Sequence, residues 1–535
     1  MNQVIQSTQS NSVPTFSVIS EILDDVSKKY NNKTALVCDS EQLTYSELSK
    51  LSAQFAYYLK QEGLKKGDVI ALVMPSILAY PIALFAAFRL GLTVVNVNPM
   101  YTFSEIEKVF GDSKVTATVV FAPMLANITK LSNVSSFKSV ISVAPGPIKI
   151  SNSNPVPEGV VDFVNALRIG DKGVWYNGWS QSDYPETSDI AFLQYTGGTT
   201  GAPKAAMLTH DNIVSCINQF LQMCTYIEPG SEVVLAPLPL YHIFGLVTGL
   251  LSSLSRGSTI ILVSDPRDVP KMANILREWP VSIMYGVNAL YSGLYHAGKL
   301  TKKDLLSLKL CGSGATALSK DVADKWLALS GCPIIEGYGM TETSGLISFM
   351  SENKYAQFGT VGFPVPNSEV SIRDEQGNKL AVNKIGELCI KGPQVMSGYL
   401  NNLEETVKTF YDDGALRTGD IARIDDKGYI WLVDRAKDMI NVSGFNVYPN
   451  EVEQVIDTFE GVLESACVSA HDEKSGEVVK AYIVRENSKQ VDIEQLLAHC
   501  RTQLTAYKIP KQIEFIAALP KSPVGKILRK NLKES

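Results

Sequence analysis

The chain has 535 residues, of which 45% are hydrophobic and 19% are charged, and its formal net charge is −6. This length exceeds one ordinary hydrophobic core, and the composition is that of a globular protein, so we expect two or more folded domains. The net charge of −6 gives no electrostatic indication of nucleic-acid binding.

The first sixteen residues are rich in Gln, Ser and Asn and lack the basic leader and apolar core of a secretory signal. The eight cysteines are scattered and form no C-x-x-C pair. This pattern favours a reduced, cytoplasmic protein over a disulfide scaffold or a zinc site.

The most membrane-like stretch runs from Val69 to Val97 and is interrupted by Pro75, Pro81 and Arg89. Its pattern changes along its length, from a buried strand at its start to a helix and then a second strand. A buried βαβ unit accounts for this better than a transmembrane span, so no transmembrane helix is predicted.

The elements around this unit have the same alternating pattern. Helical spacing of apolar residues predicts a helix within 39–60, and Ser104 with Glu107 predicts the start of another helix. Val115–Phe121 reads as a strand, and strands alternating with helices imply a mostly parallel sheet covered on both faces. The polar segment Ala144–Glu186 is interpreted as a connector between two similar α/β subdomains.

The second half continues this alternation and then departs from it. A helix at Asp211–Met223 and strands at Glu232–Ala236, Thr259–Val263, Val281–Tyr285 and Leu308–Cys311 are expected. Beyond Gly359, short strands separated by turns indicate a small β-rich subdomain that ends near Val433. From Asp438 onward a compact α+β pattern follows, with helices that open near Pro449 and at Asp492.

A segment rich in glycine and threonine, Tyr195–His210, has the composition of a phosphate-binding loop. Its glycines allow the backbone to approach a ligand, and consecutive N–H groups with threonine hydroxyls can bind an anion. It is not a Walker A loop, because Pro203 precedes its lysine and Ala205 follows it. A Gly/Thr-rich surface turn is the alternative. The candidate ligand-binding residues are Thr196, Gly197, Gly198, Thr199, Thr200, Gly201 and Lys204.

Two further segments follow predicted strands, where an α/β fold presents its binding loops. His242 lies in the first, Tyr241–Gly245, although a lone histidine there is more often structural. The second, Gly312–Thr316, would suit a nucleotide pocket lined by backbone, and a simple turn is equally compatible with it. Its candidate residues are Gly312, Gly314 and Ala315.

Gly337–Gly345 places a glutamate inside a Gly/Thr turn. Glu342 could bind Mg²⁺, which prefers oxygen ligands completed by substrate phosphates. Further along, Asp420 could accept both hydroxyls of a ribose, and Arg435 has the fixed fork of donors that suits ribose or phosphate. The segment around Asp420 and the segment around Arg435 could each also be a solvated turn.

The last motif is Pro520–Lys530, in which proline and glycine frame Lys526 and argue for a shaped loop. A lysine-rich C-terminus is otherwise most often a soluble tail. Before it, Val442–Asn446 contains Gly444, which would let a backbone edge approach a ligand closely.

Together these motifs resemble, in order and from about residue 40 to the C-terminus, the adenylate-forming superfamily of acyl-CoA synthetases, luciferases and adenylation domains. The resemblance is closest to bacterial long-chain fatty-acyl-CoA ligases. The segments that carry this finer match are Val94–Pro99, Asp265–Pro270, Ile390–Met396 and Val442–Pro449. One departure is Ala205, where glycine usually follows the loop lysine.

The resemblance implies an α/β fold: a large N-terminal domain of two mostly parallel α/β subdomains and a small β-rich subdomain, then a small, mobile α+β C-terminal domain. The implied boundaries are 1–433 for the AMP-binding domain, 434–437 for a hinge at Lys437, and 438–535 for the domain that carries the catalytic lysine.

It also implies a role for each candidate residue. Tyr338 would stack on adenine beside Gly339, and the Gly312–Thr316 turn would pack on the same base. Thr341 would contact the α-phosphate, and Glu342 with Thr196 would hold magnesium.

The resemblance assigns the later motifs in the family's order. Asp420 would bind the ribose, Arg435 the nucleotide and Gly444 the pantetheine of coenzyme A. His242 would flank the reacting carboxylate, and Lys526 would bridge that carboxylate and the α-phosphate.

The implied reaction uses ATP, Mg²⁺ and coenzyme A. A fatty-acid carboxylate attacks the α-phosphorus to give acyl-AMP and pyrophosphate, and a thiol then displaces AMP. The alternatives are a ligase for medium-chain or aromatic acids, an adenylation enzyme that loads a carrier protein, and a non-enzymatic nucleotide-binding protein. Amino-acid-activating relatives carry an aspartate at the position of His242 or beside it. Its absence here argues against an amino acid as the substrate.

We expect no nucleic-acid partner, a monomer or homodimer, and a cytoplasmic location. Peripheral contact at the cytoplasmic face of the membrane is an alternative.

Overall fold

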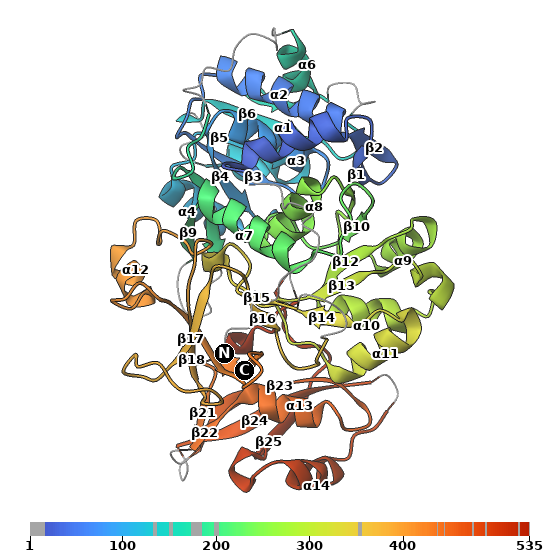
Figure 1. The fold of residues 1–535 in the computed structure, drawn as a ribbon, viewed down its shortest axis with the longest axis vertical. Helices are drawn as coiled ribbons and strands as arrows, with labels where there is room; N and C mark the ends of the chain where they lie inside the picture. The colour runs from blue at the N-terminus through green and yellow to red at the C-terminus, as the bar shows by residue number, and fades with distance from the viewer. Residues whose placement is uncertain are drawn as a thin grey trace.

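The computed structural model describes most of the chain and arranges it as three sheets of substantial size above a smaller C-terminal unit (Figure 1). The described residues are 16–131, 136–148, 154–172, 184–196, 203–350, 356–435, 437–442, 445–472, 476–486, 489–522 and 525–533.

The first sheet has seven strands in the order β7-β6-β5-β3-β4-β8-β9 and is parallel except for the antiparallel β8–β9 pair. Its strands are β3 Val69–Val73, β4 Thr93–Val97, β5 Ala117–Phe121, β6 Ser139–Val143, β7 Val161–Asp162, β8 Ile190–Thr196 and β9 Lys204–Thr209. The crossover helix α3, Ala79–Arg89, is buried along its whole length. The predicted βαβ unit is therefore confirmed, and its continuous apolar pattern arises because helix and strands are covered on all sides.

The second sheet also has seven strands, in the order β14-β13-β12-β10-β11-β1-β2, and only its β1–β2 pair is antiparallel. Its strands are β1 Thr34–Cys38, β2 Glu41–Thr44, β10 Val233–Ala236, β11 Thr259–Leu262, β12 Ile283–Gly286, β13 Leu310–Ser313 and β14 Ile334–Glu336. One hydrophobic core joins the helices between the two sheets.

Helices cover these sheets, and several begin at side-chain caps. They are α1 Ile19–Lys29, α2 Tyr45–Gln61, α4 Phe103–Ser113, α5 Leu125–Thr129, α6 Phe163–Asp171, α7 His210–Met223, α8 Ser252–Ser255, α9 Val269–Glu278, α10 Asn288–His296 and α11 Lys320–Ser330. The segment Gly245–Leu251 is a fully buried π-helix, a form that often marks functional sites.

Four antiparallel strands form the β-rich subdomain: β17 Glu369–Arg373, β18 Gly386–Lys391, β19 Leu416–Ile424 and β20 Ile430–Arg435. The two-stranded pair β15 Ser348–Phe349 and β16 Phe363–Pro364 and the short helix α12 Leu403–Thr409 accompany them.

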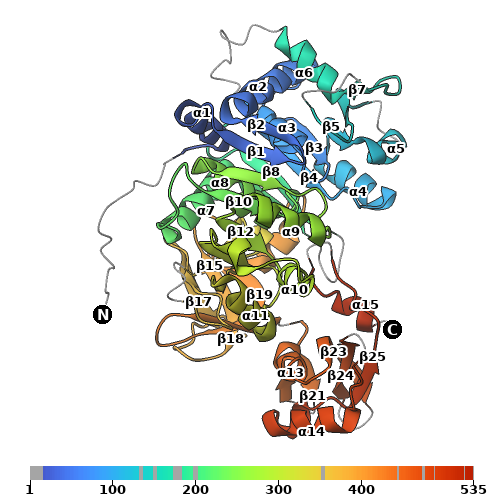
Figure 2. The same cartoon turned by 90° about the vertical axis from the view of Figure 1, so that its right-hand side faces the viewer.

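The C-terminal unit has a hydrophobic core of its own and lies at one end of the molecule (Figure 2). Its elements are β21 Ile440–Val442, β22 Phe445–Val447, α13 Pro449–Ile456, β23 Val462–Asp472, β24 Gly476–Arg485, α14 Ile493–Gln503, β25 Gln512–Phe515 and α15 Arg529–Lys533.

The predicted fold class is confirmed, but two local predictions were wrong. Helix α4 is capped by Thr102, whose side chain and that of Glu105 form the reciprocal capping box, and not by Ser104. The Ala144–Glu186 segment is more than a connector, because it contributes strand β7 and helix α6 to the first sheet. Within the described part of the chain, no helix is long and apolar enough to cross a membrane.

Candidate active site

The ends of β8 and β9 frame the predicted phosphate loop. Thr196 pairs with Lys204 across this antiparallel hairpin, and the Thr196 hydroxyl donates to the Lys204 carbonyl at 3.4 Å. The Lys204 ammonium lies 2.6 Å from a carboxylate oxygen of Glu405 and 5.4 Å from the centre of the Tyr399 ring. The remaining loop candidates, Gly197, Gly198, Thr199, Thr200 and Gly201, lie outside the described residues.

Glu342 is fixed from the same side by a residue that the sequence did not indicate. The Tyr399 hydroxyl donates to Glu342 Oε1 at 2.7 Å, and Glu342 is only 7% exposed. Its carbonyl accepts the N–H of Met396 at 2.8 Å. Thr341 lies beside it, half-buried, in the same turn. Tyr399 therefore connects the lysine of the phosphate-loop hairpin to the candidate magnesium ligand, and no pattern in the sequence marked it.

Tyr338, Asp420 and Arg435 form a second cluster. The Tyr338 hydroxyl donates to Asp420 Oδ2, and Arg435 Nε lies 3.2 Å from Asp420 Oδ1. The register of β19 and β20 sets Asp420 directly opposite Arg435, which explains how two motifs fifteen residues apart meet. Burial, then the Asp420 carboxylate, raises the pKa of the Tyr338 hydroxyl well above its usual range. Tyr338 therefore stays a neutral donor that orients the carboxylate.

The candidate glycines lie where backbone segments meet. The N–H of Gly337 donates to the Ser313 carbonyl at 2.8 Å, joining the two predicted nucleotide turns. A Cβ on Gly314 would lie 3.2 Å from the Gly337 carbonyl oxygen, and one on Gly339 would lie 2.1 Å from that of Gly345. A larger residue at 339 would therefore separate these turns.

The other two candidates in this region lie on the same strand end. A Cβ on Gly312 would lie 2.9 Å from the Tyr285 ring, and Ala315 adopts a left-handed φ of 65°. Such a φ is uncommon for a residue with a side chain and is found in tight functional turns.

His242 follows β10 and precedes the π-helix, as predicted. Its Nδ1 accepts the N–H of Phe244 at 3.3 Å. Loss of solvent, then the charge of Lys526, lowers the pKa of His242 to about 4. The ring is therefore neutral near pH 7 and carries its proton on Nε2, which can donate to an anionic ligand.

Lys526 comes from the last residues of the chain, yet it lies within electrostatic reach of His242, Asp420 and Arg435. Burial, followed by Arg435, lowers the pKa of Lys526 to about 8, while Asp420 opposes the shift. A Cβ on Gly525 would contact Val287 at 3.5 Å, so this loop packs against the large domain.

Four cations therefore face one another across this region, namely Lys204, Arg435, Lys437 and Lys526. Burial and then Arg435 lower the pKa of Lys437, and Lys204 adds to the effect. Glu405 and Asp420 pair with two of these cations, and the like charges gathered here indicate a site where an anionic ligand would relieve the remaining repulsion. Gly444, the predicted coenzyme A contact, lies outside the described residues.

These shifts predict how nucleotide binding depends on pH. Above about pH 8 the free protein loses the Lys526 charge, whereas a bound triphosphate favours the protonated form. ATP binding is expected to take up a proton near pH 8.5 and to weaken by up to about tenfold per pH unit above it.

Calorimetry in two buffers of different ionisation enthalpy measures this proton uptake. Lys526→Arg is expected to abolish it, because arginine keeps its proton throughout this range. Equal uptake by this variant would assign the proton to another group.

Known proteins are similar to this chain over nearly its whole length. Residues 23–400 match the family model of the AMP-binding enzymes, and residues 451–526 match that of the AMP-binding enzyme C-terminal domain. The long-chain-fatty-acid–CoA ligase of Salmonella typhimurium is 40% identical over 96% of this chain and 94% of its own. That of Yersinia pestis is also 40% identical, over 97% of this chain and 94% of its own. ATP-bound MatB from Rhodopseudomonas palustris has a TM-score of 0.86 and 28% identity, over 96% of this chain and 98% of its own.

Proposed function

Because this chain belongs to the AMP-binding enzymes, we propose that it is an ATP-dependent ligase that joins long-chain fatty acids to coenzyme A. The observation that carries this proposal is the packing of the loop that carries Lys526 against Val287 of the large domain, which brings Lys526 within electrostatic reach of Asp420, Arg435 and His242. Near-full-length similarity to long-chain-fatty-acid–CoA ligases supports the substrate class.

In the first step, a fatty-acid carboxylate oxygen attacks the α-phosphorus of ATP, a new P–O bond forms, and pyrophosphate leaves. We assign Lys526 to the negative charge that builds on the carboxylate and the α-phosphate. Neutral His242 donates a hydrogen bond to the carboxylate. A charged imidazolium would instead hold the carboxylate and draw it away from the phosphorus atom. Asp420 accepts the ribose hydroxyls, and Arg435 holds both this carboxylate and the nucleotide.

We assign Glu342 and Thr196 to a magnesium ion. Magnesium prefers a few oxygen ligands completed by phosphates, and the Glu342 carboxylate is buried and oriented by Tyr399. When bound, the ion neutralises charge on the phosphates. Thr341, in the same turn, is assigned to the α-phosphate.

In the second step, the thiol of coenzyme A attacks the acyl carbon, a thioester bond forms, and AMP leaves with the electron pair of the broken C–O bond. We assign the edge at Gly444 to the pantetheine. Since one small domain cannot present both Lys526 and this edge to one site, we propose that it rotates about Lys437 between the steps.

Lys437→Pro is expected to slow thioester formation from supplied acyl-AMP by about tenfold or more, and to slow it more than acyl-AMP formation, because proline fixes φ at the hinge. Rapid-quench measurement of each half-reaction tests this. An unchanged second half-reaction would count against rotation at this residue.

The acyl chain is proposed to enter beside the π-helix Gly245–Leu251 and the segment from Met284 to Leu290, both of which are apolar. A Cβ on Gly245 would lie 2.5 Å from the Pro239 carbonyl oxygen, so only glycine allows the helix to begin here.

The deciding experiment measures release of pyrophosphate and AMP with palmitate, octanoate, 4-coumarate and acetate, each with and without coenzyme A. Strong turnover with palmitate that requires coenzyme A supports the proposal. Preference for another acid replaces the substrate class. Pyrophosphate release without a thioester points to a carrier protein, and no reaction with any acid points to non-enzymatic nucleotide binding.

We further propose a cytoplasmic enzyme that contacts the membrane peripherally to collect its substrate, without spanning it. Cosedimentation with phospholipid vesicles, with and without palmitate, tests this. Recovery of all protein in the supernatant under both conditions would contradict it.

A further inference from the structure

Lys526 lies on a small hairpin whose geometry is set close to the residue itself. The Ser522 N–H donates to the Lys526 carbonyl at 2.8 Å, and the Lys526 N–H donates to the Ser522 hydroxyl at 3.1 Å. Lys521 and Ile527 form an isolated antiparallel bridge. These contacts fix the hairpin's shape. Ile527, which packs against the cluster around Tyr482, and the Lys521–Glu464 ion pair attach it to β23 and β24, but they do not connect it to α13.

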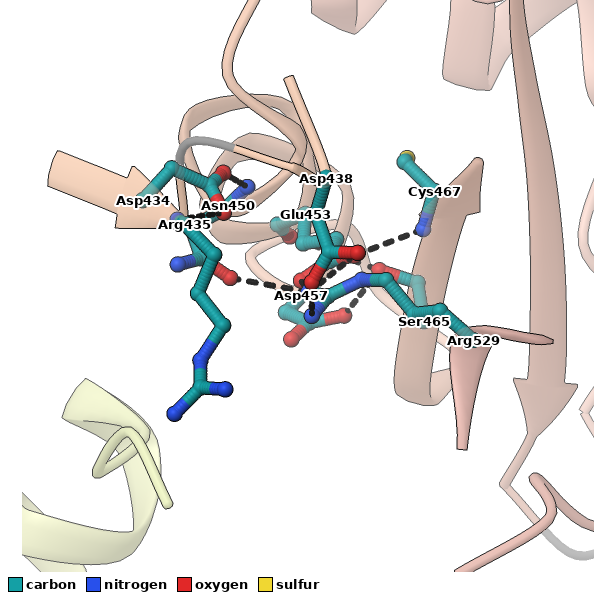
Figure 3. A network of polar contacts seen from close by, with 9 residues as sticks. All are labelled: Asp434, Arg435, Asp438, Asn450, Glu453, Asp457, Ser465, Cys467 and Arg529. Carbon is teal, nitrogen blue, oxygen red and sulfur yellow. Dashed lines mark hydrogen bonds and ion pairs between the residues drawn. The ribbon is translucent and has the colours of Figure 1, made fainter. Parts of the chain in front are cut away.

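Arg529, three residues beyond Lys526, connects the hairpin to α13 (Figure 3). Its Nη2 donates to Glu453 Oε1 at 2.9 Å and to Oε2 at 2.8 Å, and to Asn450 Oδ1 at 2.9 Å. Its Nη1 lies 3.7 Å from Asp438 Oδ2, just after the proposed hinge. The Arg529 side chain is 14% exposed and that of Glu453 is 10% exposed, so this ion pair is shielded from solvent and salt.

The acceptor of this ion pair is itself anchored. Glu453 Oε1 accepts the N–H of Cys467, in the middle of β23, at 2.6 Å. The Asn450 N–H donates to Asp434 Oδ2 at 2.8 Å. Because Tyr448 at the N-cap position makes no side-chain cap, Asp434 at the end of β20 caps α13 in its place. The contacts therefore run from β20, through α13, to the segment that carries Lys526.

Such an anchor is needed because the surroundings of Lys526 repel it. Arg435 and Lys437 are cationic, His242 is neutral, and the carboxylates of Asp420 and Asp438 offset the repulsion only in part. Without a nucleotide, an unanchored hairpin would move toward solvent, where its ammonium is hydrated.

We propose that Arg529 is a positioning residue for adenylation: by holding Glu453, Asn450 and Asp438, it fixes the hairpin on α13 and so holds the Lys526 ammonium over the nucleotide site. This inference rests on the proposed function, which gives Lys526 its role in the first step. Arg529 does not touch the substrate and acts through Lys526 alone. It therefore serves the first half-reaction and not the second.

The two half-reactions separate positioning from a general contribution to folding. Arg529→Gln is expected to lower kcat for acyl-AMP formation by about 10²-fold, since small misplacement of a catalytic group has effects of this size. The rate of thioester formation from supplied acyl-AMP is expected to stay within about twofold. Parallel losses in both half-reactions, or unchanged adenylation, would overturn the proposal.

Matched variants guard against failure to fold. Arg529→Lys keeps the charge but not the fork, so it is expected to recover adenylation only partly. A double variant, Arg529→Met with Glu453→Gln, removes both buried charges together, and it is expected to fold and to show the same selective loss. Lys521→Gln removes the partly exposed ion pair with Glu464 at the other side of the hairpin and is expected to leave both half-reactions near wild type.

A second measurement does not depend on activity. Competitive labelling of Lys526 with acetic anhydride across pH 7–11, read by mass spectrometry, follows the ionisation of its amine. In the wild type the midpoint is expected near 8, and in Arg529→Gln it should move toward the ordinary lysine value as the hairpin leaves the site. An unchanged midpoint would overturn the positioning role. If the wild-type protein activates no acid at all, the proposed function fails while this measurement still decides the role of Arg529.

Discussion

Lys526→Ala is expected to reduce acyl-AMP formation by about 10²–10³-fold, the usual effect of removing one preorganised group from a developing negative charge. The loss should appear mainly in kcat, and KM for ATP should also rise, because the Lys526 charge favours binding of the triphosphate as well as the transition state. Thioester formation from supplied acyl-AMP should remain near wild type. Pyrophosphate release in the first turnover, measured by rapid quench, gives the first rate, and coenzyme A consumption gives the second.

Lys526→Arg is the conservative comparison. It keeps a positive charge but replaces a compact ammonium with a planar fork, so partial recovery is expected. If alanine reduced both half-reactions equally, Lys526 would serve the fold of the C-terminal unit, and the assignment of its role in adenylation would be wrong.

The helices and strands could be predicted from the sequence because their hydrophobic periods and caps lie within short stretches of the chain. The strand and helix periods of residues 69–97 and the side chain of Asp492, which caps α14 through the N–H of Gln495, needed no tertiary information. The errors lie where local signals compete. Thr102 and Ser104 are both acceptable caps, and only the reciprocal bonds between Thr102 and Glu105 decide between them.

The candidate site was predictable only in its residue types. Asp420 and Arg435 were both singled out, but their contact depends on the register of β19 and β20. Tyr399 and Arg529 were missed as site residues because a tyrosine or an arginine gains its role here from partners 57 or more residues away. The pKa of His242 is lowered first by its burial and then by Lys526, which comes from near the end of the chain, and neither could be inferred from the sequence around His242.

Asp420 is expected to be the second most sensitive position, because it connects three groups. Its carboxylate accepts a hydrogen bond from the Tyr338 hydroxyl and forms an ion pair with Arg435, and the residue is 7% exposed. We assign the same carboxylate to both ribose hydroxyls. Asp420→Asn keeps the shape of the side chain but replaces one acceptor oxygen with an amide NH2 donor. This donor would then face two other hydrogen-bond donors. Each charge-assisted bond is worth about 1.5–3 kcal/mol, so loss of both ribose contacts should lower kcat/KM for ATP by about 10²–10⁴-fold.

A comparison of ATP with 2′-deoxy-ATP separates the ribose contact from damage to the cluster. The wild type should discriminate strongly against the deoxynucleotide, since it leaves the Asp420 carboxylate short of a donor. The Asp420→Asn protein should discriminate weakly, because the interaction with the 2′-hydroxyl is already lost. Equal discrimination by both proteins would show that Asp420 acts only by orienting Tyr338 and Arg435, and the ribose would then need another acceptor. The difference between the two ratios measures the coupling of this carboxylate to the ribose hydroxyl, free of any general effect on stability.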